Sequence, residues 1–183
     1  MPGVIRHQQR HVHQTIYQHV RAALGLAGWM GGTPPFNAVP VTMLDIQPIE
    51  GGVVPALNCV AVTMGEERPF MDLEMGAGLT GGSIDFYCDV FGQDLSTAVA
   101  ICDDIRDAMD VIIPLRDYTH LVTGVPVDAL IEFEEVGVDV PPTAGQVDQR
   151  TWRVVAGVAV CEFIPREVDL VTGYTQGYTE PYH

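Results

Sequence analysis

The feature that most constrains the fold of this chain is a change of hydrophobic period between Ser83 and Asp110. In the stretch SIDFYCDV, apolar and polar residues alternate, which is typical of a half-buried strand. After FGQ, in DLSTAVAICDDIRDAMD, apolar residues recur every three or four positions, which indicates an amphipathic helix. Asp94 or Ser96 can cap this helix, and Pro114 is expected to end it. The predicted apolar stripe of the helix consists of Val99, Cys102, Ile105, Met109 and Ile112.

The other segments predict a single domain, residues 1–183, built around this strand and helix. With 183 residues, 47% of them hydrophobic, the chain can bury one sizeable core. The predicted segments are a helix at 5–24, a Gly- and Pro-rich loop at 25–40, an α+β core at 41–164 and an extended C-terminal tail at 165–183. Within the core, strands are predicted at 41–49, 54–64, 69–75, 83–90, 127–136 and 150–164, with loops at 76–82 and 115–126.

Clustered strands with only two helices predict an α+β fold and argue against a doubly wound one. The expected architecture is a mixed, largely antiparallel sheet of about six strands, with the N-terminal helix and one central helix packed on it. The last strand, RTWRVVAGVAVCEFI, is apolar on both faces in its middle.

The charges are distributed unevenly along the chain. Net charge is −15; residues 1–44 contain three arginines and no carboxylate, whereas residues 45–183 contain six arginines and all 24 acids. A body this acidic repels the nucleic-acid backbone, which argues against sequence-specific binding of nucleic acid. No apolar run reaches the ~18 residues of a membrane span, and the polar N-terminus lacks the apolar block of a signal peptide. We therefore expect synthesis and folding in the cytoplasm, with no membrane partner.

The acidic side of the central helix is the main candidate for a metal site. Asp103 and Asp107 share one helix face, and a two-metal site would need further carboxylates from Asp85, Asp89 or the run EFEE at 132–135. Alternation in the strand already explains Asp85 and Asp89 as solvated residues. A solvated or partner-facing helix side is therefore the favoured interpretation. A metal-dependent hydrolase that uses Asp85, Asp103 and Asp107 is the alternative from a different class.

Other motifs with binding or catalytic potential have simpler structural explanations. The GAGLTGG run precedes a strand and lacks the helix N-terminus on which phosphate loops depend. His7 and His11 share a helix face, but the first 44 residues hold no carboxylate to complete a metal site. The four cysteines form no CxxC pair and lie in apolar patterns, which is typical of reduced core thiols. No cofactor, metal or enzymatic activity is therefore expected.

The order and texture of the elements resemble a known family. The polar N-terminal helix, the strands after it, the stretch DVFGQDLSTAVAICDDIRDAM and the later Trp-led strand RTWRVVAGVAV are similar to the tail terminator proteins of long-tailed bacteriophages. The resemblance covers most of the chain, residues 5–164, and related head–tail connector and tail-tube proteins share much of this architecture. The Gly- and Pro-rich segment at 28–40 and the Tyr-rich end have no counterpart in it.

This resemblance implies a structural protein of the virion, assembled in the host cytoplasm, that forms a homohexameric ring. Such a ring caps the head-proximal end of the tail tube, stops tube polymerisation and docks to the neck. The implied partners are further copies of itself, the tail-tube protein and the head–tail connector or stopper protein, and DNA passes through the lumen without specific binding. The nearest alternatives are a head–tail stopper or connector and a tail-tube subunit of the same particle. The family contributes no catalytic residue.

A head-to-tail ring needs two different, complementary patches on each subunit. The basic N-terminal helix and the acidic central helix form such a pair in the sequence. We therefore expect an arginine of the first helix to contact the acidic side of the second helix in a neighbouring subunit. The residues predicted for this inter-subunit interface are Arg6, Arg10, Asp103, Asp104, Asp107 and Asp110.

Overall fold

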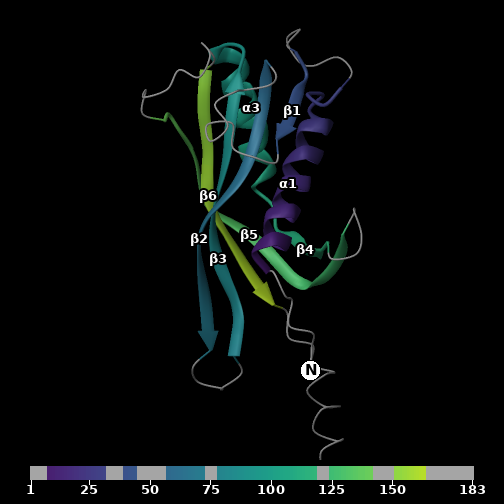
Figure 1. Ribbon diagram of the computed structural model, residues 1–183, viewed down its shortest axis with the longest axis vertical. Helices are drawn as coiled ribbons and strands as arrows, with labels where there is room; N and C mark the ends of the chain where they lie inside the picture. The colour runs from purple at the N-terminus through teal and green to yellow at the C-terminus, as the bar shows by residue number, and fades with distance from the viewer. Residues whose placement is uncertain are drawn as a thin grey trace, which may run out of the picture.

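The structure is a computed structural model that describes residues 8–31, 39–44, 57–72, 78–118, 124–141 and 151–163. Figure 1 shows the elements along the chain. They are α1 (Gln8–Leu26), β1 (Val41–Leu44), β2 (Asn58–Asp72), β3 (Gly78–Gly92), α3 (Leu95–Ala108), β4 (Ile113–Asp117), β5 (Val125–Asp139) and β6 (Thr151–Phe163).

The six described strands form one sheet in the order β1-β2-β3-β6-β5-β4. The pair β1 and β2 is parallel, and the other four neighbouring pairs are antiparallel. At the centre of the sheet, β3 and β6 are paired from Gly81 opposite Glu162 to Gly92 opposite Thr151. The predicted α+β class is therefore confirmed, with its mixed, largely antiparallel sheet and its N-terminal and central helices.

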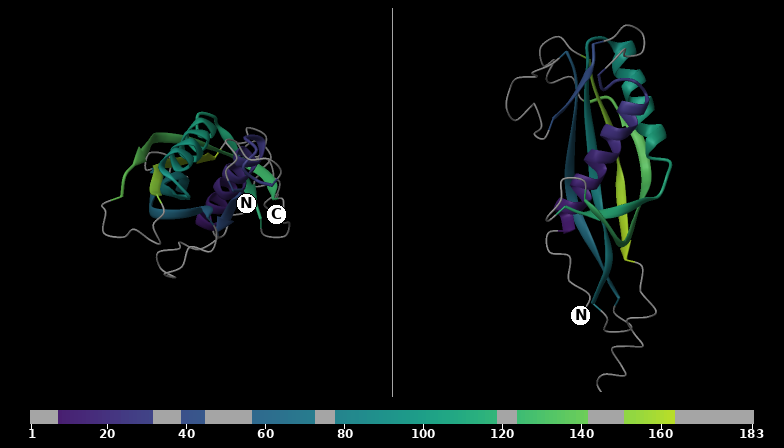
Figure 2. Two further views of the ribbon diagram at one scale, coloured as in Figure 1. Left: turned by 90° about the horizontal axis from the view of Figure 1, so that it is seen from above. Right: turned by 90° about the vertical axis from the view of Figure 1, so that its right-hand side faces the viewer.

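Both helices lie on the same face of the sheet, which curls around them (Figure 2). We call this the inner face and the opposite one the outer face. The core between the helices and the inner face includes Ile16 and Leu24 of α1, Ile101 of α3, and Phe86 and Val90 of β3, all fully buried. Alternation along β3 puts Phe86, Cys88 and Val90 inward and the residues that alternate with them outward. A single packed core therefore holds both helices against the sheet.

The end of α1 turns the chain back into this core. Gly28 takes a positive φ of 88°, a conformation that glycine adopts without steric cost. The backbone N–H of Trp29 then donates to the carbonyl oxygen of Leu24 at 2.8 Å, which closes the helix end. Trp29 is fully buried as a result. The helix thus ends at Leu26, slightly later than the expected end at residue 24.

The predicted apolar stripe of the central helix is partly wrong in phase. Val99 and Ile112 are 41% and 57% exposed, whereas Ala98 and Ile101 are fully buried beside the correctly predicted Cys102 and Ile105. The reason is the close approach of α3 to the end of β3, where a Cβ on Gly92 would lie 2.7 Å from the backbone nitrogen of Ala98.

The helix also ends at Ala108, before Pro114, which lies in β4. A proline is tolerated there because β4 is an edge strand of the sheet.

Three strand predictions are corrected as well. One long strand, β2, replaces the two strands expected at 54–64 and 69–75. The pairing with β3 is irregular between Met64 and Glu67, but the strand continues through Gly65. A glycine there leaves room for the ring of Tyr87, whose Cε2 would lie 2.9 Å from a Cβ. Residues 78–82 of the expected loop belong to β3, and residues 115–117 of the other expected loop belong to β4. The predicted tail at 165–183 and residues 32–38 of the predicted loop at 25–40 lie outside the described residues.

Candidate functional site

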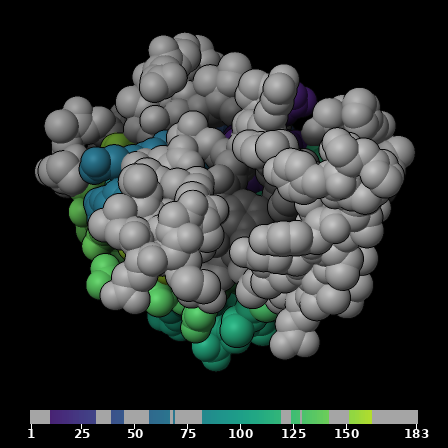
Figure 3. Space-filling model, turned by 90° about the horizontal axis from the view of Figure 1, so that it is seen from below, coloured from purple at the N-terminus to yellow at the C-terminus, as the bar shows by residue number. Residues whose placement is uncertain are grey.

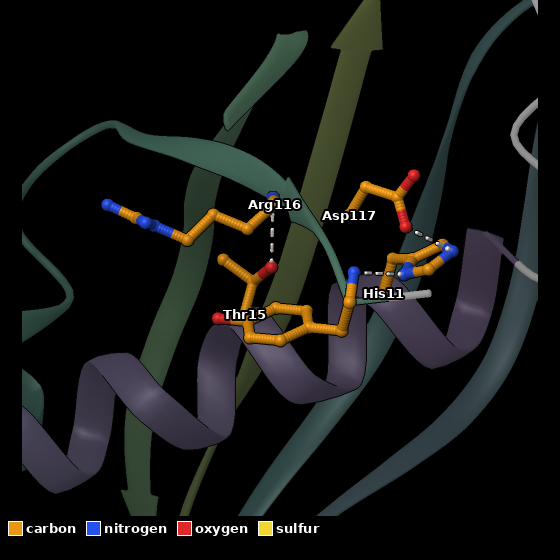
Figure 4. Close-up of polar contacts among 5 residues, drawn as sticks. His11, Thr15, Arg116 and Asp117 are labelled. Atoms are coloured by element: carbon orange, nitrogen blue, oxygen red, sulfur yellow. Dashed lines mark hydrogen bonds and ion pairs between the residues drawn. The ribbon is translucent and has the colours of Figure 1, made fainter. Parts of the chain in front are cut away.

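Helix α1 is fixed to strand β4 by two buried polar side chains (Figure 4). His11, only 3% exposed, accepts the backbone N–H of Tyr118 at Nδ1 over 3.1 Å. Its Nε2 atom lies 3.5 Å from a carboxylate oxygen of Asp117. One helical turn later, the hydroxyl oxygen of Thr15 accepts the backbone N–H of Arg116 at 3.2 Å. His11 is therefore a structural residue of the described fold and does not face outward as half of a chelating pair.

Two further histidines fix α1 to other elements. The Nε2 atom of His13 donates to the carbonyl oxygen of Val62 on β2 at 2.9 Å, and that of His19 donates to the carbonyl oxygen of Ala108 at the end of α3 at 2.7 Å. His19 also stacks on Phe133 of β5, with ring centroids 5.9 Å apart. With the inward side so fully engaged, the opposite side of α1 is left to solvent. That outward stripe of α1 consists of Arg10, Gln14, Gln18 and Arg21.

The predicted acidic side of α3 contains one residue with a structural role. Asp104 accepts the indole N–H of the fully buried Trp29 at 2.6 Å. This aspartate therefore connects α3 to the chain that follows α1. It lies half-buried at the edge of the core, and its place in an inter-subunit interface stays a prediction.

Of the other aspartates of this side, Asp107 and Asp110 are exposed and Asp103 is half-buried, and two of the three share one arginine. Arg106 lies 3.1 Å from Asp103 and 3.7 Å from Asp107, both measured between guanidinium and carboxylate atoms. Exposed pairs of this kind contribute about 0 to 1 kcal/mol each. Asp110 follows the helix end and is exposed. The acidic charge of α3 is thus partly neutralised within the subunit.

The structure separates the residues proposed for an interface within one subunit. Arg10 lies near the start of α1, whereas α3 packs beside the later half of α1 and the turn after it, where His19 and Trp29 contact α3. A contact between Arg10 and the acidic side of α3 would thus have to join two subunits, and it stays a prediction. Arg6 lies outside the described residues.

The residues of the hydrolase alternative do not converge. Asp85 lies on the outer face of β3, where Arg68 of β2 donates to it at 3.3 Å. Asp103 and Asp107 belong to the helix that covers the inner face. Within the described residues, no three side chains of His, Cys, Asp or Glu gather closely enough to hold a metal ion.

All four cysteines are buried free thiols. Burial raises the pKa of Cys102 to about 12, and burial together with the nearby Asp89 raises the pKa of Cys88 even more. Neither thiol is therefore ionised near neutral pH, which excludes them as thiolate nucleophiles in this conformation.

Sequence reasoning missed the outer face of the sheet. On β6, every second residue from Val154 to Val160 is apolar, half-buried and turned to this face. We call the four residues Val154, Ala156, Val158 and Val160 the valine stripe. The sequence signal for this surface was the middle of the last strand, which is apolar on both faces. The described helices cover only one of those faces. Figure 3 shows that atoms of β2 and β5 reach the surface on the left of the view.

Two residues at one end of the outer face pack closely together. The rings of Phe91 and Trp152 stack with centroids 5.7 Å apart and an interplanar angle of 10°. The indole N–H of Trp152 donates to a carboxylate oxygen of Asp89 at 3.0 Å. Cys59 and Leu44 complete this small cluster. The strand end at FG and the Trp-led strand therefore meet in space.

Comparisons with known proteins add no identification: no protein-family model matches the chain, and no curated protein is similar to it in sequence. Of the helices in the described part of the chain, none is both long and apolar enough to cross a membrane.

Proposed function

We propose that this chain is the subunit of a ring in the tail of a long-tailed bacteriophage. The ring caps the head-proximal end of the tail tube, stops tube polymerisation and presents a surface to the neck. Its partners are further copies of itself, the tail-tube protein and the head–tail connector or stopper protein. The protein is a structural component of the virion and has no catalytic role.

The observation that carries this proposal is the packing of Phe91 on Trp152. Phe91 comes from the strand end that leads into α3, and Trp152 begins the last strand. The sequence features behind the resemblance to tail terminators are thus neighbours in one sheet, with the central helix directly beside them. That these features, far apart in the sequence, lie together in the fold supports the proposal.

The distribution of charge supports a conduit for DNA. The chain carries a net charge of −15, and its carboxylates lie on both α3 and the strands. A lumen lined with carboxylates repels the phosphate backbone, so DNA passes without adhering. Conversely, α1 carries two arginines and no carboxylate, which suits it to contacts with an acidic surface of another subunit. Such exposed charge pairs contribute little affinity, so most of the stability of the ring must come from apolar burial.

Native mass spectrometry of the purified chain, followed by negative-stain imaging, tests the proposal. A six-subunit species that appears as a closed ring with a central hole is the expected result. Long tubes would replace the proposal with a tail-tube subunit. A monomer that carries stoichiometric divalent metal would overturn it and favour the hydrolase alternative.

A further inference from the structure

On the outer face of the sheet, apolar residues of β6 lie between carboxylates of the two neighbouring strands. Across the sheet, Val158 lies between Asp85 of β3 and Glu134 of β5, and Val160 lies between Ser83 and Glu132. The valine stripe is thus bordered by carboxylates. No described helix covers it, because α1 and α3 both pack on the inner face. Its chemistry fits a partner with apolar side-chain stems and cationic ends.

The carboxylates on the β5 side of the stripe are available for such a partner. Glu132, Glu134 and Asp139 are exposed, and none has an ion pair or hydrogen bond with another described residue through its side chain. On the β3 side, Asp85 is already paired with Arg68. The unneutralised charge therefore lies along β5. Leu130, at 39% exposure, extends the apolar surface at one end of this row.

The same chain carries a surface with the complementary chemistry. Arg10 and Arg21 of the outward stripe of α1 are exposed, and neither guanidinium contacts a carboxylate among the described residues. They are eleven positions apart, so they lie on the same side of the helix, roughly 16 Å from each other. Between them lie Gln14 and Gln18, whose methylene stems can cover apolar surface while their amide ends stay polar, as the stems of arginines do.

The dimensions of the two surfaces agree. The valine stripe, from residue 154 to residue 160, is roughly 20 Å long at the rise of a strand. Carboxylates on the strands beside it lie roughly 10 Å apart across the stripe, since neighbouring strands are ~4.8 Å apart. An α-helix with its side chains is about 10 to 12 Å wide. Along the stripe, Glu134 and Asp139 lie opposite Val158 and Val154, so they are roughly 13 Å apart, close to the spacing of the two arginines. A helix can therefore lie along the stripe with its arginines at these carboxylates of β5.

We infer that the outward stripe of α1 in one subunit packs on the valine stripe of the next subunit, with Arg10 and Arg21 reaching Glu134 and Asp139. The two patches differ, so the contact is head-to-tail and can close into a ring. This inference rests on the proposed function and names the interface of the ring. On α3, by contrast, Arg106 already lies between Asp103 and Asp107, so less charge is left there for a neighbour.

Paired charge reversals test the interface in the full-length chain. One variant carries Arg10→Glu and Arg21→Glu, and the other carries Glu134→Arg and Asp139→Arg. Each variant alone places like charges across the contact, so assembly should need at least about tenfold more protein than in the wild type. Mixed together, the two variants restore opposite charges at every contact. Native mass spectrometry should then detect rings in which the two chains alternate.

Two controls separate this interface from the ring itself. The double reversal Asp107→Arg and Asp110→Arg changes the same amount of charge on α3 and should leave the assembly concentration within about twofold of wild type. Circular dichroism must show all variants folded. Suppose that the wild type forms rings. If both reversal variants then assemble at the same concentration as the wild type, or if the two variants fail to co-assemble, the proposed interface is wrong but the ring is not. Wild-type protein that never forms a ring would overturn the proposed function, and an unassembled mixture would then overturn the interface too.

Discussion

Replacing Asp104 with alanine should destabilise the protein far more than replacing the neighbouring Asp103. Asp104 accepts the indole N–H of Trp29, which is fully buried, so the alanine variant leaves a buried donor without a partner. Such a loss costs about 1 to 3 kcal/mol of unfolding free energy. Asp103 forms only an exposed pair with Arg106, whose loss costs roughly 0.3 to 0.5 kcal/mol.

These free energies translate into separable melting temperatures. For a chain of this size, 1 kcal/mol corresponds to roughly 2 to 4 °C in Tm. A mid-range loss of about 2 kcal/mol for Asp104→Ala therefore lowers Tm by about 4 to 8 °C, whereas Asp103→Ala lowers it by at most about 2 °C. The conservative variant Asp104→Asn keeps an acceptor oxygen and should fall between them.

Thermal and urea unfolding followed by circular dichroism measures the difference. All variants must be compared at one low protein concentration, because assembly stabilises the folded state by mass action. If Asp104→Ala and Asp103→Ala unfold at the same urea concentration, the contact of Asp104 with Trp29 contributes nothing. The placement of this aspartate as a structural residue would then be refuted.

Three further predictions concern α3 and its junction with β3. Asp94 caps α3, and the backbone N–H of Thr97 holds the pKa of the Asp94 carboxyl below the ordinary value. The stability that Asp94 adds relative to the Asp94→Ala variant should therefore be full at pH 6 and shrink as the pH falls below about 4. Urea midpoints that differ equally at pH 6 and pH 3 would contradict this. Burial raises the pKa of Cys102 to about 12, so little thiolate is present at pH 8. Alkylation of Cys102 should therefore be slower in the folded protein than in the urea-unfolded chain by a factor on the order of a thousand, as peptide mass spectrometry can measure. Gly92→Ala would set a Cβ 2.7 Å from the backbone nitrogen of Ala98, so it should cost about 1 to 3 kcal/mol in urea unfolding, and a neutral result would mean that α3 shifts freely.

Hydrophobic period predicted the centre of the fold but not its details. The alternation after Ser83 and the helical period after Asp94 fixed the types of β3 and α3, because each period is a direct consequence of burying one side of that element. The phase of the stripe on α3 could not be predicted. It depends on how closely the helix approaches Gly92, which is a tertiary contact. The glycine in β2 misled for the same reason, since Gly65 makes room for a neighbouring ring and does not end the strand.

The candidate surfaces were predictable only in part. The arginines of α1 and the aspartates of α3 are visible as charge patterns, and their exposure followed from the amphipathic period. The hydrogen bond from Trp29 to Asp104 was not predictable, because the two residues are 75 positions apart in the chain. Nor could the carboxylates of β5 be placed beside the valine stripe without the order of the strands. Pairing β5 with β6 is a property of the whole sheet.

The strand order also sets when the protein can fold during its synthesis. The last described strand to be made, β6, lies in the middle of the sheet, between β3 and β5. Until residues 151–163 leave the ribosome, β3 and β5 both wait with an unpaired edge, and the chain behaves as two incomplete halves. Closing contacts across such long sequence separations is slow compared with local pairing. A nascent or truncated chain that lacks β6 therefore exposes two edges at once, which makes it prone to aggregation and a natural target for chaperones.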